Sequence, residues 1–296
     1  MTRVAFLGLG AMGAPMAEHL TKSPFDLVVW NRTPEIARAF ALRHRVRAAL
    51  TPAEATIGAD FAITCLPSSR EVRELVESDQ GLAAGLGRGS TLIDCTSGDP
   101  VTSRGTAEFL SQGGVEFVDA PVSGGVKGAE AGTLTVMCGG GEIAVRRARE
   151  VLTTFAGKIV RCGGVGSGHA VKAMNQALLA IHIWSTGECL AALAKQGVDS
   201  RVALDVINGS SGRSNTSENL FPERVMNRAF PRTFRLALLD KDVAIASQIA
   251  SDAGIDAPFI ELAARLFSEA HKTLGDEADH VEAVRVIEDR AGVHVS

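Results

Sequence analysis

The 296-residue sequence lacks the patterns that mark a metalloprotein or a disulfide-stabilised protein. Its five cysteines are widely and irregularly spaced, with no CxxC pair, and an odd number cannot form a complete disulfide framework. We therefore expect reduced thiols that fill the core, and a cytoplasmic location. The seven histidines include no pair at ligand spacing on one helix face, so no metal site is predicted.

Blocks of basic residues and a long N-terminal apolar run are also missing. The net charge is −4 and only 22% of residues are charged, so we expect no nucleic-acid or membrane partner. Gly8, Gly10 and Gly13 interrupt the apolar start and Glu18 follows it, which indicates neither a signal peptide nor a spanning helix. The apolar content of 46% is typical of a globular protein with one large or two ordinary domains.

The first half of the chain alternates short, nearly continuous apolar runs with helical stretches. Such runs are typical of strands that are covered on both faces, and their alternation with helices predicts a doubly wound parallel sheet, an α/β Rossmann fold. The predicted strands are residues 4–7, 27–30, 60–65, 91–94, 115–119 and 134–138.

The pattern changes after about residue 162, where no further strand is indicated. We predict an all-α domain over residues 163–296, after an α/β domain over residues 1–162. Its expected helices, which leave a polar loop at 209–219, are residues 165–196, 201–207, 237–253, 258–274 and 281–291.

A glycine-rich turn follows the first predicted strand: Gly8-Leu9-Gly10-Ala11-Met12-Gly13. GxGxxG is weak evidence alone, but here it lies between a strand and a helix at the start of a β-α-β unit. In that context the first glycine permits the turn, the second admits a pyrophosphate and the third allows close helix packing. The phosphates would bind to N–H groups at the positive end of the helix, so we predict a dinucleotide site.

Asn31-Arg32-Thr33 ends the second predicted strand, where NAD-binding proteins usually carry a carboxylate. A carboxylate would repel a 2′-phosphate, whereas Arg32 can hold one with a charged fork and its neighbours can donate. NADP(H) is therefore the preferred cofactor, with NAD(H) tolerated if Arg32 is only a solvated turn residue.

The stretch GHAVKAMNQ at 168–176 places Lys172 one turn into the long apolar helix and Asn175 three residues later, on the same face. A dehydrogenase needs a group that takes or gives a hydroxyl proton, and a lysine does so when its pKa falls towards the working pH. Apolar neighbours and the positive helix end both disfavour the ammonium form. A lysine here could otherwise extend into solvent.

A second glycine-containing loop, Ser123-Gly124-Gly125, follows a predicted strand. Its backbone N–H groups and the serine hydroxyl are suited to binding a carboxylate, although the same residues could form a plain turn.

These motifs together resemble the β-hydroxyacid dehydrogenase family, which includes 3-hydroxyisobutyrate dehydrogenases and the tartronate, glyoxylate and succinic semialdehyde reductases. The similarity runs nearly end to end. The residues that carry it are VAFLGLGAMGAPMAEHL, CLP at 65–67, DCTS at 94–97, DAPVSGGVKGAEAGTL at 119–134, GHAVKAMNQ and Lys241-Asp242.

The resemblance implies roles for individual residues. Lys172 corresponds to the family's catalytic lysine with Asn175 as its partner, and Ser123, Gly124 and Gly125 correspond to its substrate-carboxylate loop. Lys241 corresponds to a lysine that contacts cofactor and substrate. The positions expected to line the adenosine and the nicotinamide ribose are Leu66, Pro67, Thr96 and Ser97.

The chain departs from the family pattern at two places. Gln176 replaces the second residue of the usual Asn-Asn pair, and Thr96-Ser97 reverses the usual Ser-Thr order. The expected function is NADP(H)-dependent interconversion of a small β-hydroxy carboxylate and its semialdehyde or oxo acid, by a homodimer or tetramer. The alternatives are an imine reductase, which usually lacks the lysine, a non-catalytic NADP-binding module, and 6-phosphogluconate dehydrogenase, which needs a longer helical domain.

Overall fold

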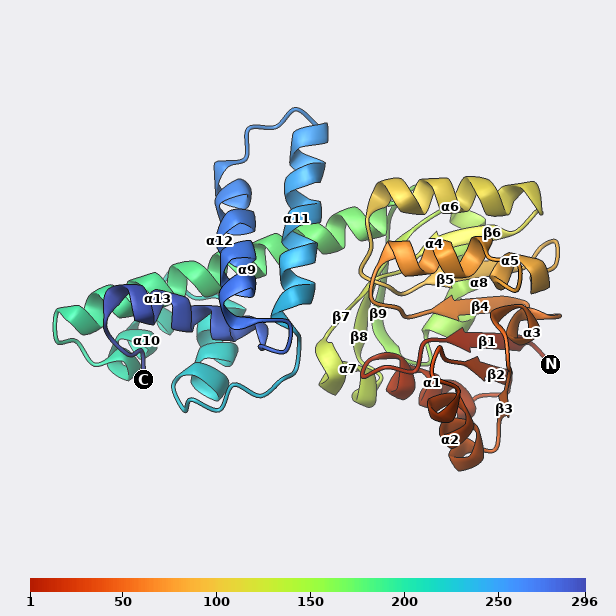
Figure 1. Cartoon of the computed structure of the whole chain (residues 1–296), viewed down its shortest axis with the longest axis horizontal. Coiled ribbons are helices and arrows are strands. Elements are labelled where there is room, and N and C mark those ends of the chain that lie inside the picture. Colours follow the sequence, from red (N-terminus) through yellow and green to blue (C-terminus); the bar gives the residue numbers. More distant parts are fainter. The chain divides into compact units, whose positions relative to one another are not determined.

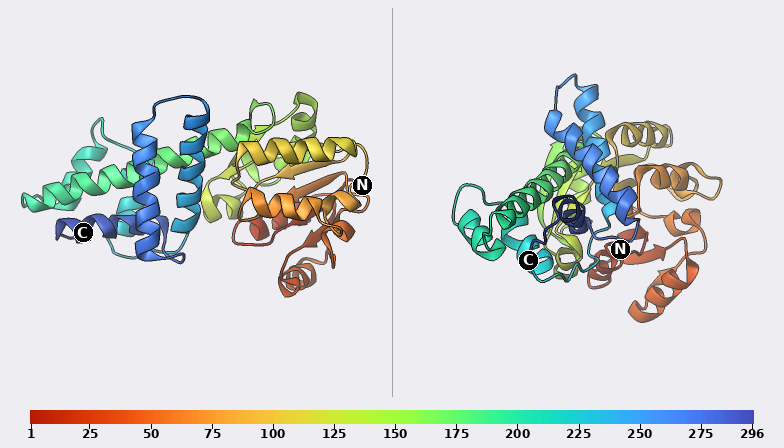
Figure 2. Two further views of the ribbon diagram at one scale, coloured as in Figure 1. Left: turned by 45° about the horizontal axis from the view of Figure 1, so that its top comes forward. Right: turned by 60° about the vertical axis from the view of Figure 1, so that its left-hand side comes forward.

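The computed structural model describes residues 1–296, which divide into two compact units, residues 1–172 and 173–296. The first unit is α/β and the second is helical (Figures 1 and 2). Helix α9, Ser167–Lys195, runs through the boundary, so its first turn belongs to the α/β unit. The all-α character predicted for the second half is confirmed.

A nine-stranded sheet forms the centre of the first unit, in the order β3-β2-β1-β4-β5-β6-β8-β7 with β9 beside β8. All pairs from β3 to β6 are parallel, as predicted. Strand β8 is antiparallel to β6 and β7, and β9 pairs with β8 in parallel. The chain returns through the short helix α7, so this edge is not doubly wound. The strands are β1 Arg3–Leu7, β2 Asp26–Trp30, β3 Arg47–Ala48, β4 Phe61–Thr64, β5 Thr91–Asp94, β6 Glu116–Asp119, β7 Val122–Ser123, β8 Leu134–Gly139 and β9 Ala156–Gly163.

Both faces of the sheet are covered, which explains the continuous apolar runs. Along β1, Val4 and Phe6 pack into one core cluster while Ala5 and Leu7 pack into another. The first cluster includes residues of α1, α2, α7 and α8, and the second includes residues of α3 to α6. These helices are α1 Gly13–Thr21, α2 Pro34–His44, α3 Pro52–Thr56, α4 Ser69–Glu77, α5 Leu82–Gly85, α6 Pro100–Gln112, α7 Gly125–Ala131 and α8 Glu142–Leu152.

The helical unit packs the rest of α9 against six further helical segments around its own core, which contains Trp184 and Phe267. These segments are α10 Ser200–Asn208, the π-helix η1 Thr216–Val225, α11 Leu236–Asp252, α12 Pro258–Leu274, and the short helix η2 His280–Glu282 that leads into α13 Ala283–Ala291. The polar loop predicted at 209–219 was too long, because η1 begins inside it. Ser214 and Ser217 each accept a hydrogen bond from the other's backbone N–H, a reciprocal arrangement that starts this helix.

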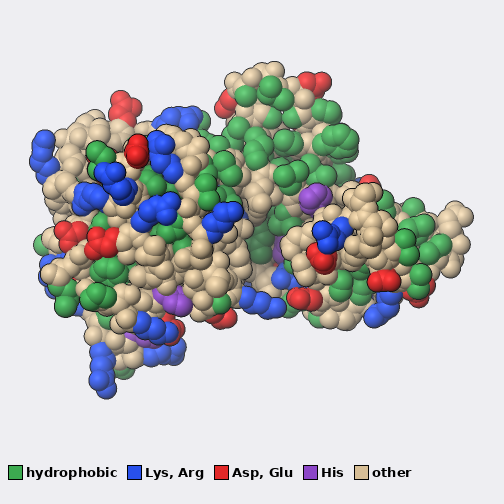
Figure 3. Space-filling view, turned by 180° about the vertical axis from the view of Figure 1, so that it is seen from behind, with side chains coloured by type: hydrophobic (Ala, Val, Ile, Leu, Met, Phe, Trp, Pro, Cys, Tyr) green, Lys and Arg blue, Asp and Glu red, His purple; other side chains and the backbone are tan.

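The surface carries apolar, basic and acidic side chains interspersed on the face seen in Figure 3. Helix α9 is long and apolar enough to span a bilayer by length and composition, and 39% of its most apolar window is buried in the protein. Because α9 supplies core residues to the helical unit, its apolarity is explained by packing.

Candidate active site

The glycine turn between β1 and α1 meets the steric demands of a nucleotide-binding loop. Gly8 has a φ of +103°, and a Cβ on Gly8 would lie 2.3 Å from the carbonyl oxygen of Cys65. A Cβ on Gly13 would lie 1.9 Å from the carbonyl oxygen of Gly8. A Cβ on Gly10, in contrast, would meet nothing within 4 Å. Two glycines therefore close the turn, while Gly10 leaves space at the helix start into which a pyrophosphate fits.

The end of β2 is tied to this turn through Asn31. Its Oδ1 accepts a hydrogen bond from the N–H of Leu9 at 3.0 Å, and its Nδ2 donates to the carbonyl of Thr33 at 3.2 Å. From the sequence, the Asn31 side chain was expected to donate to a 2′-phosphate. In the structure both ends of its amide instead bond to the backbone and hold the loop. Arg32 is exposed, so its guanidinium can reach a ligand beyond the strand end.

Glu71, at the start of α4, is an electrostatic neighbour of Arg32 that sequence reasoning missed. Burial opposes ionisation of Glu71, but the hydrogen bond from Ser68 and the positive charges of Arg70 and Arg32 lower the pKa of this carboxyl. The carboxylate places negative charge near the group expected to hold a 2′-phosphate.

Thr96 organises the loops after β4 and β5. The Asp94 carboxylate accepts hydrogen bonds from the hydroxyl of Thr64 at 2.8 Å and the N–H of Thr96 at 3.1 Å. The Thr96 hydroxyl in turn accepts from the N–H of Leu66 at 3.1 Å. Since Thr96 is only 1% exposed, its hydroxyl holds the Leu66-Pro67 turn in place. Ser97 is half-buried beside it.

The carboxylate of Asp119, the last residue of β6, caps the start of α9. It accepts hydrogen bonds from the backbone N–H groups of Gly166 at 2.7 Å and His169 at 3.0 Å. A Cβ on Gly168 would lie 2.2 Å from the carbonyl oxygen of Met137, so the helix packs directly on β8. These contacts satisfy helix N–H groups that would otherwise lack partners, and they fix where α9 begins.

His169 is fully buried and connects α9 to two further elements. Its Nε2 lies 2.9 Å from the carbonyl of Thr96, and its Nδ1 lies 2.6 Å from the hydroxyl of Ser103 on α6. A carbonyl only accepts, so Nε2 donates. The sequence contained one signal for these roles: His169 and Asp119 are polar residues inside apolar runs.

Lys172 follows one turn after His169 and is only 8% exposed. A lysine that simply extends from a helix start into solvent would be far more exposed. Because α9 is held at Asp119 and His169, the Lys172 side chain projects from a helix start with a defined position.

The Ser123-Gly124-Gly125 segment joins the end of β7 to the start of α7, two short elements that the sequence did not indicate. Gly124 has a φ of +135° and Gly125 a φ of +62°, conformations that favour glycine. Both glycines are exposed and Ser123 is half-buried. The backbone of this loop is therefore accessible to a ligand.

The remaining predicted residues belong to the helical unit. Exposed Asn175 donates from Nδ2 to Oε1 of Gln176 at 3.3 Å. Lys241, on α11, forms an ion pair with Asp242 in which Nζ lies 2.8 Å from Oδ1. Gln176 and Asp242 are both buried. The sequence marked Gln176 only as a departure from the family pattern and gave Asp242 no separate role.

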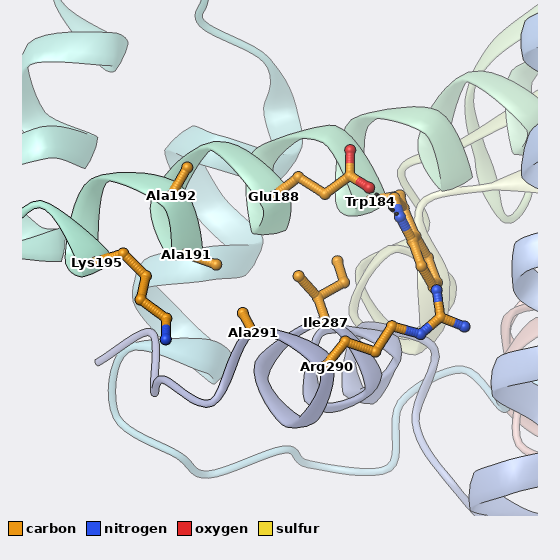
Figure 4. Close-up of a pocket in the computed structure, with 8 residues that line it drawn as sticks. All are labelled: Trp184, Glu188, Ala191, Ala192, Lys195, Ile287, Arg290 and Ala291. Carbon is orange, nitrogen blue, oxygen red and sulfur yellow. Dashed lines mark hydrogen bonds between the residues drawn. The ribbon is translucent and has the colours of Figure 1, made fainter.

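The helical unit also contains a hollow of about 310 Å³ between α9 and α13 (Figure 4). Trp184 donates from Nε1 to Glu188 at 2.8 Å, and the guanidinium of Arg290 lies 5.7 Å from the Trp184 ring. The lining is otherwise mainly aliphatic, and none of the predicted site residues is part of it. We assign it no part in the chemistry.

The five cysteines are unpaired, as predicted. Burial raises the pKa of the Cys65 and Cys138 thiols to about 12 and raises that of Cys95 as well. These thiols therefore remain protonated and unreactive. Cys189 is exposed, so the prediction that every cysteine fills the core was wrong for this residue. No group of three or more His, Cys, Asp or Glu side chains could hold a metal ion.

Comparison with known families decides which group of proteins this chain resembles. Residues 3–164 match the model of the NAD-binding domain of 6-phosphogluconate dehydrogenase. Residues 166–287 match the NAD-binding domain model of NADP-dependent 3-hydroxyisobutyrate dehydrogenase. The mitochondrial 3-hydroxyisobutyrate dehydrogenase of Mus musculus is 35% identical over 84% of this chain and 76% of its own length. The chain belongs to the β-hydroxyacid dehydrogenase family.

Other members of the β-hydroxyacid dehydrogenase family extend this similarity to the whole chain. The 2-(hydroxymethyl)glutarate dehydrogenase of Eubacterium barkeri is 31% identical over 99% of this chain and 97% of its own. The structure of Mycobacterium tuberculosis 3-hydroxyisobutyrate dehydrogenase with L-serine superposes with a TM-score of 0.89, at 32% identity, over 97% of this chain and 99% of that chain.

The family assignment makes this chain a nicotinamide-dependent dehydrogenase that acts on a hydroxyl group of a small hydroxy acid. A further structural neighbour, Psf3, was determined with NADP⁺ and 2-OPP; it has a TM-score of 0.84 at 26% identity and covers 96% of this chain and 99% of that one. The space at Gly10 and the turn that Asn31 ties to β2 fit such a cofactor.

Proposed function

We propose that this protein prefers NADP(H) and interconverts a small β-hydroxy carboxylate with its semialdehyde or oxo acid. The observation that carries the proposal is the nearly buried Lys172 on a helix that is fixed at its start by Asp119 and His169. General acid–base catalysis needs a proton-transferring group in a fixed position.

The proposal gives each of the candidate site residues a role in binding or proton transfer. Gly8 to Gly13 hold the pyrophosphate, and the bound nicotinamide supplies or accepts the hydride. Ser123, Gly124 and Gly125 bind the substrate carboxylate through a hydroxyl and exposed backbone N–H groups. Lys172 takes the proton of the substrate hydroxyl during oxidation and returns it during reduction. Asn175 hydrogen-bonds to the same oxygen, and Lys241 contacts cofactor and substrate.

The relatives support the choice of substrate class. Both 3-hydroxyisobutyrate and 2-(hydroxymethyl)glutarate, which the relatives' names contain, carry a hydroxymethyl group on the carbon next to a carboxylate. That chemistry needs one site for the carboxylate and one for the hydroxyl. Arg32, at a strand end without a carboxylate at residues 31–33, supports the preference for NADP(H).

A substrate screen tests the proposal. The purified protein is assayed with 3-hydroxyisobutyrate, 2-(hydroxymethyl)glutarate, tartronate, serine, glyoxylate and succinic semialdehyde, each with both cofactors in the matching redox state. We expect the highest kcat/KM for a β-hydroxy carboxylate with NADP⁺, and a large loss with its methyl ester, which lacks the charged group. Equal turnover of acid and ester, or a preference for NAD⁺, would contradict the proposal.

The proposed assembly is a homodimer or tetramer in a reducing, cytoplasmic compartment. Unpaired thiols support that compartment. Leu178 on α9 is 55% exposed, and Val202 and Val206, one turn apart on α10, are more than 60% exposed. Exposed apolar residues of this kind favour contact with a second copy. Sedimentation velocity is expected to show a dimer or tetramer for the wild type and a smaller species for Leu178→Glu; a wild-type monomer would contradict the assembly.

A further inference from the structure

The helical unit contains a row of four polar side chains joined by three contacts: Asn175, Gln176, Asp242 and Lys241. We propose that Gln176 is a positioning residue. Its hydrogen bond to Asp242 fixes the direction of the Asn175 amide and keeps the Asp242 carboxylate in place against Lys241. The inference rests on the proposed function, in which Asn175 and Lys241 contact substrate.

Asp242 is the centre of this row. It lies on α11, is 2% exposed, and its Oδ1 lies 2.8 Å from Nζ of Lys241. Its Oδ2 accepts a hydrogen bond from Nε2 of Gln176 at 3.1 Å. A buried carboxylate is costly unless its oxygens have partners, so Lys241 and Gln176 together make this charge tolerable.

The carboxylate determines the orientation of both amides. An ionised carboxylate only accepts hydrogen bonds, so Gln176 must turn its NH₂ group towards Asp242. Its Oε1 then faces Asn175, which must donate from Nδ2 at 3.3 Å. The Asn175 amide is thereby held in one orientation, and the second hydrogen of its Nδ2 can donate to the substrate oxygen whose proton Lys172 takes. The buried carboxylate on α11 therefore determines which atom of the Asn175 amide is available to the substrate.

Small residues bring the two helices close enough for these bonds. Ala173 and Ala177 lie beside Gln176 on α9 and form a buried cluster with Ala246, one turn after Asp242 on α11. Gln176 is itself only 4% exposed. Hydrogen bonds are stronger where water is excluded, so the Gln176–Asp242 bond is well placed to fix the row. An asparagine at 176 would be one methylene shorter.

Two substitutions of Gln176 test the inference. Gln176→Leu keeps the approximate size but removes the hydrogen bonds to Asn175 and Asp242, so we expect kcat/KM for the hydroxy acid to fall on the order of tenfold. Cofactor Kd should change much less, because the glycine turn is untouched. Gln176→Glu places a second carboxylate against Asp242. At low pH one of the two carboxyls is protonated and can donate as the amide does, so the ratio of variant to wild-type kcat/KM should rise as the pH falls from about 8 to about 5.

Comparing the variant with the wild type as a ratio removes the effect of other titratable groups near the row. Lys241 faces Asp242 on α11, Lys172 lies one turn before Gln176 on α9, and His271 of α12 contacts Asp240, the residue before Lys241. These groups are present in both proteins, so their effects on the rate cancel in the ratio of variant to wild type. Gln248→Leu is the matched control, because Gln248 donates to Asp252 on an exposed part of α11, and its kcat/KM should equal the wild-type value.

The outcomes separate this inference from the proposed function. Wild-type kcat/KM in Gln176→Leu, or a Gln176→Glu ratio that does not change with pH, overturns the inference alone. Recovery of Gln176→Glu at low pH supports it even if Gln176→Leu fails to fold. A wild-type protein that oxidises no β-hydroxy acid overturns the proposed function, and this inference with it.

Discussion

The carboxylate of Asp119 accepts a hydrogen bond from the backbone N–H of His169 at 3.0 Å, and this contact attaches the start of α9 to the end of β6. The same carboxylate accepts from Gly166. Asp119→Asn replaces one acceptor oxygen by a donor, which opposes an N–H group. We expect a loss of about 1–3 kcal/mol in unfolding free energy and a larger fall in kcat than in substrate affinity, because Lys172 loses its fixed position.

Urea unfolding and steady-state kinetics measure these two effects. Asp99→Asn is the matched control, since Asp99 caps α6 by accepting from the N–H of Thr102 at 2.8 Å. Loss of that cap should lower stability and leave kcat unchanged. If both variants lower kcat equally, the cap at α9 has no specific role in placing Lys172.

Replacement of Lys172 tests the acid–base assignment. Lys172→Ala should lower kcat by a factor of about 10²–10⁴, the range that positioned general acid–base groups contribute. Cofactor affinity, measured by fluorescence titration, should change little because the glycine turn is untouched. Lys195→Ala, an exposed lysine in the last turn of the same helix, should behave as wild type. Wild-type turnover by Lys172→Ala would remove the assignment.

Cofactor preference depends on the charge around Arg32. Arg32→Asp should raise KM for NADP⁺ by about 10- to 100-fold, since a charge-assisted bond of roughly 1.5–3 kcal/mol is lost and repulsion is added. Glu71→Gln should act in the opposite direction and more weakly, because it removes a negative charge near Arg32. Arg38→Ala, which disrupts an exposed pair with Glu35 on α2, is the control. An unchanged ratio of NADP⁺ to NAD⁺ efficiency in Arg32→Asp would rule out this explanation.

Acid stability should depend on Asp279. Burial opposes its ionisation, but a hydrogen bond and the charge of His280, together with the N–H groups of Phe234 and Thr233, hold the pKa of this carboxyl far below its usual range. A depressed folded-state pKa means that the stabilisation is complete above the unfolded pKa of about 3.9 and is lost as the pH falls below it.

Asp279→Asn should therefore unfold at lower temperature than wild type near neutral pH, with a loss of about 1–3 kcal/mol, and the difference should shrink below pH of about 4. Thermal unfolding at several pH values measures this. Asp252→Asn, at an exposed carboxylate, should show neither effect. A constant difference between Asp279→Asn and wild type at every pH would show that Asp279 stabilises the protein without its charge.

Sequence reasoning located the parts of the fold that depend on local pattern. Strand β5 and helix α12 were predicted to the residue, because apolar runs and a proline at the helix start define them. Strands β3, β7 and β9 were missed. The first two have only two residues each, and β9 is mostly half-buried or exposed at the sheet edge, so none of them shows a continuous apolar run. The reversal of β8 was not predictable, because a strand sequence does not encode its direction.

Short motifs indicated candidate site residues, whereas their distant partners were not indicated. The glycine turn lies between the expected strand and helix, and the Ser123 loop lies between two short elements that were not predicted. The Gln176–Asp242 hydrogen bond joins residues 66 positions apart, and His169 contacts Ser103 across the same separation. Such pairs exist only after the chain has folded, so no local pattern reveals them.

The three glycines of the first turn are under different constraints. Side chains at Gly8 and Gly13 would collide with the protein's own backbone, whereas one at Gly10 would meet no protein atom. A descendant of this chain that no longer bound a nucleotide could therefore lose Gly10 and still need the other two for folding. Within this turn, a substitution at Gly10 alone would therefore indicate that nucleotide binding had been lost while the fold was retained.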